Sequence, residues 1–251
     1  MYNFVVYLNY NIMKTKKNLA DYNHPLVKET ADMLTEKEET VRGKLEKLFY
    51  YVRDEIKFGF LPELDYVSAS EIIQKKVGQC NNKAVLLFSL CTAISIPARM
   101  HFSLIKKEIQ RGLFKGIAYK LIPENISHCW VEVLVEDRWR NIDSYINDET
   151  YYLAAKRELK SRDWDTGFSV ACSSGESSSS FDIDEEKFVQ MDAVVEDQGV
   201  WPDPSEYFYS DRYNNRKSAI KTFVVLNLIF PRVNKRVRQL RQSCVNGECN
   251  S

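Results

Sequence analysis

The chain has 251 residues, of which 35 are basic and 35 acidic, so that it carries no formal net charge. This length suffices for one large domain, or for one domain with an extension, and for a sizeable buried core. The neutral balance argues against nucleic acid as a partner, because such binding depends mainly on a basic surface.

The sequence shows neither a membrane span nor an export signal. No apolar run reaches the roughly 18 residues that cross a bilayer. In the N-terminal stretch MYNFVVYLNYNIMKTKKN the lysines follow the apolar residues, the reverse of a secretory signal. We therefore expect a cytoplasmic protein. Met13 is an alternative start, and we predict an N-terminal extension (1–24), a core (25–155) and a C-terminal extension (156–251).

The cysteines do not indicate a disulfide framework or a metal site. Six cysteines are few for a chain of this length. No C-x-x-C pair is present, so zinc-ribbon and thioredoxin-type chemistry lack their central feature. Cys244 and Cys249 are too isolated to predict a metal site. We expect no metal and no cofactor.

Four helices are predicted before residue 94. The segment 25–57 has apolar residues at helical spacing in two groups, which predicts two helices. A shorter helix follows over 68–77, with Ser68 or Ser70 as its cap and Glu71 in its first turn. The segment 80–93 predicts another strong helix. It begins at Cys80, and its apolar stripe consists of Ala84, Leu87, Leu90 and Cys91.

Alternating apolar residues then predict strands. ARMHFSLIKK, from Ala98, forms one strand, and HCWVEVLVEDRWRNIDSYI, from His128, forms two around a turn at Glu136 and Asp137. The stretch 108–126 between them is poorly periodic. Helices followed by an antiparallel sheet define an α+β fold.

The last hundred residues give weaker signals. CSSGESSSSFDIDEE (172–186) is Ser-rich and acidic and predicts a loop. WPDPSEYFYSDRY (201–213) predicts a second loop. The end of the chain reads as an apolar helix interrupted by Pro231 and followed by a basic helical stretch. That stretch either docks on the core or forms a basic surface for a membrane or a partner.

Cys80 is placed where a thiol can react. The free N–H groups at a helix N-terminus favour an anion, so we expect a lowered pKa for this cysteine. Its own N–H is suited to stabilise the oxyanion of acyl transfer. The simpler interpretation is a small hydrophobic residue at a helix start.

A thiolate nucleophile usually works with an imidazole that a carboxylate orients. If the hairpin loop is Glu136-Asp137, Val135 pairs with Arg138, and His128 and Asp143 share one face as diagonal neighbours. A slip of one residue would separate them. The alternatives are a strand-edge histidine and a turn-capping aspartate.

Three sequence segments together resemble a known family. GQC opens a helix, IPAR follows it, and HCWVEVLVEDRWRNID comes next. This order is similar to that of the transglutaminase-like domain, a relative of papain-type cysteine proteases. The resemblance covers roughly 40–150 and implies a helix that starts at the nucleophile and packs on an antiparallel sheet. It implies a triad of Cys80, His128 and Asp143.

The chain also departs from the family pattern. The position after the nucleophile, often aromatic, is Asn81, and the position after the histidine, often small, is Cys129. No paired zinc motif and no EF-hand loop is present, so deglycosylation and calcium dependence are not expected. Gln79, Asn81 and Trp130 are further candidates for oxyanion or substrate positioning, although Trp130 also suits packing of the hairpin.

These observations predict thiol-dependent acyl transfer on amide bonds of a peptide or protein. The products would be those of hydrolysis, glutamine deamidation or transamidation, and no residue decides among them. The alternatives are a non-catalytic interaction module on the same fold and a membrane-surface adaptor that works through the C-terminal basic helix.

Overall fold

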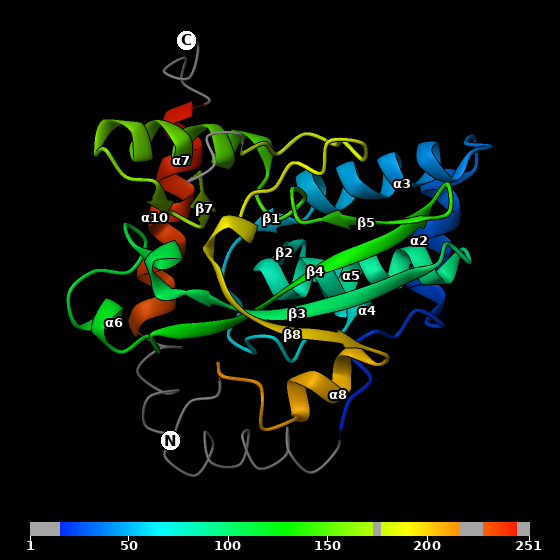
Figure 1. Cartoon of the computed structure of the whole chain (residues 1–251), viewed down its shortest axis with the longest axis horizontal. Coiled ribbons are helices and arrows are strands. Elements are labelled where there is room, and N and C mark those ends of the chain that lie inside the picture. The colour runs from blue at the N-terminus through cyan, green and yellow to red at the C-terminus, as the bar shows by residue number, and fades with distance from the viewer. Residues whose placement is uncertain (1–15, 173–176, 216–227, 245–251) are drawn as a thin grey trace.

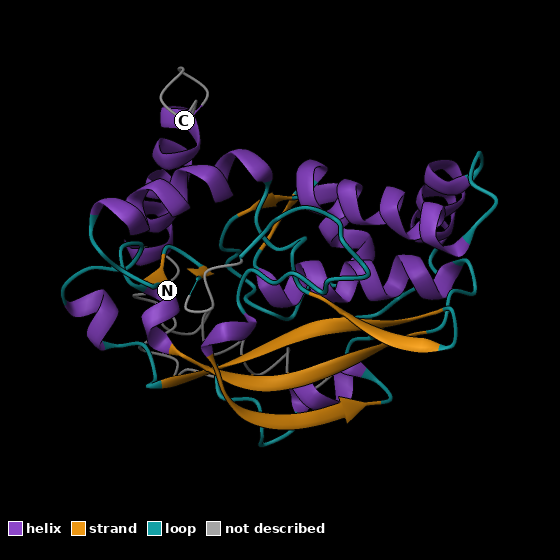
Figure 2. Cartoon of the chain, turned by 45° about the horizontal axis from the view of Figure 1, so that its top comes forward, coloured by secondary structure: helices purple, strands orange, loops and turns teal. Residues whose placement is uncertain are grey.

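A computed structural model describes residues 16–172, 177–215 and 228–244 (Figure 1). Its centre is a four-stranded antiparallel sheet in the order β5-β4-β3-β8. The N-terminal helices cover one face of this sheet, and α7 and α10 lie together at one end of the molecule (Figures 1 and 2). The predicted α+β class, with the Cys80 helix packed on an antiparallel sheet, is confirmed.

The N-terminal helices form as their sequence signals predict. They are α2 (Pro25–Thr35), α3 (Val41–Tyr50, continued by a π turn over Tyr51–Glu55) and α4 (Ala69–Lys75). The Ser68 side chain accepts from the backbone N–H of Glu71, and the Ser68 backbone N–H donates in return to the Glu71 carboxylate at 3.1 Å. This reciprocal pair is a capping box, which satisfies two N–H groups that a helix start leaves free.

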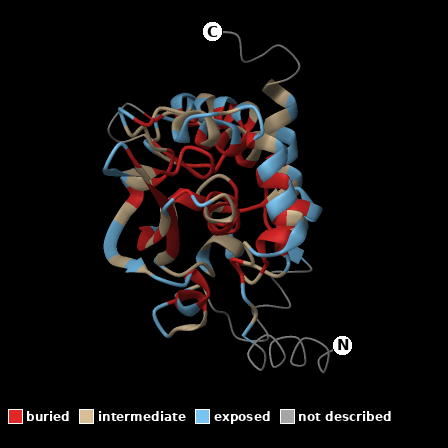
Figure 3. Cartoon of the chain, turned by 90° about the vertical axis from the view of Figure 1, so that its right-hand side faces the viewer, coloured by how far each residue is buried: buried red, intermediate tan, exposed pale blue. Residues whose placement is uncertain are grey.

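The central helix is α5 (Cys80–Ala93), with the predicted bounds. The prediction of a single apolar stripe is wrong, because every residue from 81 to 91 is buried. α5 packs between α2, α3 and α4 on one side and the strands β3 and β4 on the other. A helix buried on all sides needs no polar face. The buried shell around it is visible in Figure 3.

The predicted hairpin has the predicted register. β4 (Asn125–Val135) pairs with β5 (Arg138–Ile142), and Val135 lies opposite Arg138. Glu136 and Asp137 form the turn with φ of 53° and 60°, as a two-residue hairpin loop requires. β3 (Ala98–Lys106) runs antiparallel to β4 on its other side.

Several C-terminal elements were not predicted. β8 (Val194–Trp201) pairs with β3 and completes the sheet, and α7 (Glu149–Ser161) spans the predicted boundary at residue 155. The segment expected as a second loop contains a short helix, α8 (Pro204–Tyr209). The smaller elements are β1 (Lys57–Phe58), β2 (Val77–Gly78), β6 (Thr166–Gly167), β7 (Val170–Ala171), α6 (Ile117–Lys120) and the 3-10 turns Lys107–Gln110 and Met191–Ala193.

The last described helix is α10 (Phe230–Ser243). Pro231 lies in its first turn, where a missing N–H costs no helical hydrogen bond, and most of the apolar helix expected before Pro231 lies outside the described residues. Phe230, Val233 and Val237 are buried, so the apolar face of α10 packs on the protein itself. Within the described ranges, no helix is both long and apolar enough to span a bilayer.

Candidate active site

Local structure places Cys80 at the first residue of α5. β2 ends at Gly78, where a Cβ atom would lie 3.0 Å from the Cβ of Asn82, so only glycine fits without a shift. Gln79 then caps the helix, and its backbone N–H donates to Asn82 Oδ1 at 3.2 Å. The chain therefore turns sharply from strand to helix at the cysteine.

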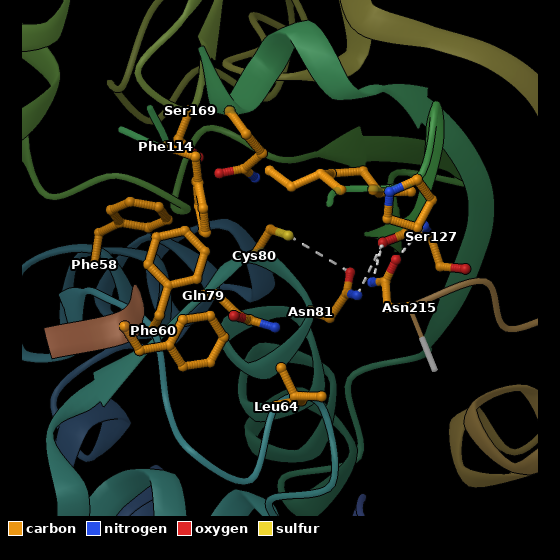
Figure 4. A pocket seen from close by; sticks show the side chains of 15 residues that line it. Phe58, Phe60, Leu64, Gln79, Cys80, Asn81, Phe114, Ser127, Ser169 and Asn215 are labelled. Atoms are coloured by element: carbon orange, nitrogen blue, oxygen red, sulfur yellow. Dashed lines mark hydrogen bonds between the residues drawn. The ribbon is translucent and has the colours of Figure 1, made fainter. Parts of the chain in front are cut away.

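Cys80 opens into a cavity of about 70 Å³ (Figure 4). One water molecule needs roughly 10–15 Å³ on this measure, so the cavity is larger than a single water molecule requires. Most of the wall is apolar. The lining residues are Phe58, Phe60, Leu64, Gln79, Cys80, Asn81, Gln110, Phe114, Ile122, Pro123, Ile126, Ser127, Ser169, Asn215 and Phe230.

The expectation of a lowered thiol pKa is wrong. Burial raises the pKa of Cys80, and the nearby Asp65 carboxylate raises it further. The backbone N–H groups of Asn81 and Cys80 point at the sulfur and lower the pKa, as the helix start predicts, but they do not outweigh burial. Cys80 therefore stays a neutral thiol at neutral pH, although the residue is partly exposed.

Asp65 organises the base of the site. It is 1% exposed and accepts hydrogen bonds from Gln79 Nε2 (2.5 Å), Asn81 Nδ2 (3.0 Å), Asn215 Nδ2 (3.3 Å) and the Tyr213 hydroxyl. Four donors satisfy a buried carboxylate without a cation. Asp65 was not predicted, because in sequence it is an ordinary loop aspartate.

Gln79 and Asn81 are both at the cavity, and both are engaged in internal hydrogen bonds. Asn81 Nδ2 donates to the Ser127 carbonyl at 3.2 Å, and Asn81 Oδ1 accepts from the thiols of Cys80 (3.7 Å) and Cys129 (3.3 Å). These bonds attach the start of α5 to β4. They fix the backbone around the sulfur. Because amide N–H donors of Gln79 and Asn81 are used in internal bonds, these donors are not free for a substrate.

His128 lies in β4 opposite Ser103 and is fully buried. Neither ring nitrogen has a hydrogen-bond partner within the described part of the chain. Burial lowers its pKa to about 3, so the imidazole is neutral at physiological pH. Burial thus keeps His128 unprotonated at neutral pH, and the structure shows no hydrogen bond from it to Cys80.

Asp143 directly follows β5. The printed β4–β5 pairing ends at Val131 and Ile142, so Asp143 lies one residue beyond the paired part of the hairpin. Its carboxylate accepts three backbone N–H groups, from Val189 (2.6 Å), Gln190 (2.7 Å) and Met191 (3.0 Å). Burial raises its pKa to about 7 despite these bonds. No hydrogen bond between Asp143 and His128 is present.

Trp130 is not among the residues that line the cavity. Its indole N–H donates to Asn141 Oδ1 at 2.8 Å, and its ring stacks on His101 with centroids 4.3 Å apart. The centroid of His128 lies 6.4 Å away on the same side of β4. The position suits a packing role beside the imidazole.

The described residues hold no group of three or more metal-ligating side chains. At the cavity the structure brings together Cys80, Gln79 and Asn81. Three further lining residues, Ser169, Asn215 and Phe230, come from the C-terminal part and could not be assigned to the site from sequence, because their contacts depend on the tertiary fold.

A central helix that begins at a cysteine and packs on an antiparallel sheet defines the cysteine-protease-like class of α+β domains. Residues 28–144 match the family model of the transglutaminase-like superfamily. The match begins within α2 and ends two residues after β5, and it contains Cys80, His128 and Asp143.

Two solved structures match part of this chain. One is a putative cysteine protease from Cytophaga hutchinsonii, with 19% identity and a TM-score of 0.40 over 51% of this chain and 38% of that chain. The other is a putative protease from Parabacteroides distasonis, with 17% identity and a TM-score of 0.35 over 51% of this chain and 26% of that chain. The chain thus matches well under half the length of either. Comparison with curated proteins finds no match.

Proposed function

We propose that the chain is a thiol enzyme that transfers an acyl group from an amide of a peptide or protein, with Cys80 as the nucleophile. The family match supports a thiol-dependent enzyme in general. The observation that carries the proposal is the position of the sulfur. It lies at the N-terminus of the central helix, with two backbone N–H groups directed at it, and opens into a cavity.

The pKa values favour a neutral thiol and a neutral imidazole over a preformed ion pair. The proton then passes from Cys80 Sγ to His128 as the C–S bond forms. The N–H groups of Cys80 and Asn81 stabilise the oxyanion, and the imidazolium returns the proton to the departing amine. Water or a second amine releases the acyl group from the thioester.

This mechanism requires the imidazole to come within hydrogen-bond reach of the sulfur. Hydrogen bonds between catalytic groups are often long without substrate and tighten in the complex. Asp143 acts as the orienting group if one of its lone pairs, beyond those used by the three N–H donors, accepts from the ring.

The test is product analysis on a peptide library, with and without a primary amine. Wild-type protein is expected to yield cleaved peptide or free glutamate, or to incorporate the amine, and Cys80→Ala is expected to abolish each product. Cys172→Ala is the matched control, because Cys172 is also a partly exposed free thiol. Product that persists in Cys80→Ala excludes the proposal.

A second candidate, a non-catalytic interaction module, is favoured because, among the described residues, His128 makes no hydrogen bond to Cys80 or to Asp143. Iodoacetamide separates the two. A labelling rate at Cys80 that falls in His128→Ala supports the enzyme. A labelling rate that is unchanged in this variant supports the module.

The membrane adaptor is the weaker alternative, because the apolar face of α10 is occupied by the core. Membrane binding by the basic face of α10 can nevertheless be tested. Liposome co-sedimentation that disappears on truncation after Ser218 would support the adaptor, and absence of binding would dismiss it.

A further inference from the structure

The cavity beside Cys80 has an aromatic wall built from three separate parts of the chain. Phe60 lies at its centre, with the ring of Phe114 at 5.3 Å and the ring of Phe230 at 5.5 Å between centroids. Phe60 precedes α4, Phe114 follows the Lys107–Gln110 turn, and Phe230 begins α10. Figure 4 shows Phe60 and Phe114 on one side of Cys80 and Asn81 on the other. The ligand-facing surface is therefore apolar and rigid.

The helix α10 is fixed directly to this wall. Asn234 exchanges two hydrogen bonds of 2.9 Å with the backbone of Phe60, and Arg236 donates to the carbonyl of Leu113, next to Phe114, at 2.6 Å. Arg241 donates to the carbonyl of Phe58 at 3.1 Å and forms an ion pair with Asp148. Asn234, Arg236 and Arg241 thus each donate to a backbone carbonyl at or beside an aromatic residue of the cavity. This arrangement positions Phe230 as a specific part of the wall.

A polar acceptor is buried in the same cavity without a partner. Gln110 is 9% exposed and lines the cavity, and its Oε1 atom has no hydrogen-bond partner within the described ranges. An unpaired buried carbonyl oxygen is costly unless a ligand or water supplies a donor. A peptide N–H next to an apolar side chain would supply it.

We propose that the cavity is a substrate-specificity site, in which Phe60, Phe114 and Phe230 hold an aromatic or branched aliphatic side chain next to the reacting carbonyl and Gln110 Oε1 accepts the adjacent substrate N–H. This inference rests on the proposed function, since it takes Cys80 as the attacking group. It also assigns a role to α10, which lies outside the matched segment 28–144.

The test compares three alkylating probes on the full chain. N-benzyl-2-chloroacetamide carries both the ring and the N–H, N-methyl-2-chloroacetamide lacks the ring, and N-benzyl-N-methyl-2-chloroacetamide lacks the N–H. In each case the thiol sulfur displaces chloride and a thioether forms. Rates of labelling at Cys80 are measured by peptide mass spectrometry and divided by the rates with free N-acetylcysteine.

The wild type is expected to prefer the benzyl over the methyl probe by about tenfold or more, from burial of the ring. Phe230→Ala should lower this preference at least several-fold. Phe230→Trp should also lower it, because the larger ring fills the cavity. Gln110→Met should remove the preference for N-benzyl-2-chloroacetamide over its N-methylated form, which lacks the N–H. The preference for the benzyl over the methyl probe should stay largely intact.

Val237→Ala is the matched control, since it removes a buried side chain of α10 that does not line the cavity. Its benzyl preference should stay within about twofold of the wild type. An equal loss in Val237→Ala and Phe230→Ala, or a wild type without preference, would overturn the specificity site. Absence of labelling at Cys80 with every probe would instead overturn the proposed function.

Discussion

Two histidines flank Trp130 on one face of the sheet, and their surroundings differ completely. His101 in β3 has a carboxylate on each ring nitrogen, Glu132 at 2.5 Å and Asp197 at 2.6 Å. His128 in β4 has no partner on either nitrogen within the described ranges. Burial lowers the pKa of both rings. For His101 the two carboxylates outweigh it and raise the pKa, whereas His128 falls to about 3.

The difference separates a structural histidine from a candidate base. His101 has all its hydrogen-bonding capacity used, and it connects β8 to β4 across β3. His128 lies opposite Ser103, whose buried hydroxyl likewise has no hydrogen-bond partner in the described part of the chain. Most buried polar groups in folded proteins are paired, so unpaired ones at one place indicate a site that another molecule completes.

The largest expected effect concerns activity. His128→Ala should lower kcat/KM on the best library peptide by about 10²–10⁴, the usual contribution of a general base. His101→Ala, the matched control on the other side of Trp130, should lower it by less than tenfold. Equal losses in the two variants would break the distinction between the histidines.

The next effect concerns the pH dependence of stability. Between pH 4 and 6.5 the unfolded state binds a proton at His128 that the folded state does not, so stability falls as pH falls. Asp143 has a pKa raised to about 7, so over the same range the folded state holds a proton that the unfolded state has lost. Its contribution to stability therefore rises as pH falls. The two contributions cancel in the wild type over this range.

Single variants should therefore reveal opposite slopes, each at most about 1.4 kcal/mol per pH unit. In His128→Gln, the free energy of unfolding should decrease relative to the wild type as pH rises from 4 to 6.5. In Asp143→Asn it should increase over the same range. Urea titrations at several pH values measure both slopes, and slopes of the same sign would contradict the assignment of the two pKa values.

The smallest effect concerns the paired histidine. Glu132 is 6% exposed and accepts from both His101 and Arg99. Glu132→Gln should cost about 1–3 kcal/mol of unfolding free energy, since it weakens two charge-assisted bonds. It should also lower the pKa of His101. NMR titration of His101 measures this shift, and an unchanged pKa would show that Glu132 does not hold the ring charged.

The stabilising contribution of His101 has a defined pH window. Because its folded pKa is raised, the contribution is fully present below the unfolded value of about 6.5 and is lost as pH rises through the folded pKa. The loss should be smaller in Glu132→Gln.

The sequence predicts well what local patterns determine. The start of α5 at Cys80 follows from a glycine, a capping residue and an apolar run, and the register of β4 with β5 follows from alternation around a two-residue turn. β8 was missed because it is largely exposed at the sheet edge and shows no alternation. α7 was missed although Asp148 caps it and apolar residues recur within it.

The candidate site was predicted only in part for a physical reason. The helix N-terminus favours a thiolate at Cys80, but burial, which depends on the tertiary fold, dominates its pKa. Likewise, Asp65, Gln110 and Phe230 meet around the sulfur through contacts that no short motif encodes. The candidate triad of Cys80, His128 and Asp143 stays a prediction from order and spacing, and the ionisation of these residues and the aromatic wall of the cavity could not be predicted in that way.

The most direct measurement is a search for the acyl-enzyme itself. A reaction with the best library peptide is stopped with acid during turnover, and the protein is digested and mapped by mass spectrometry. The account predicts an acyl group on the peptide that contains Cys80, at a higher level in His128→Ala if release also needs the base. Product formation with no acylated cysteine, or with acylation at Cys172 instead, would contradict it.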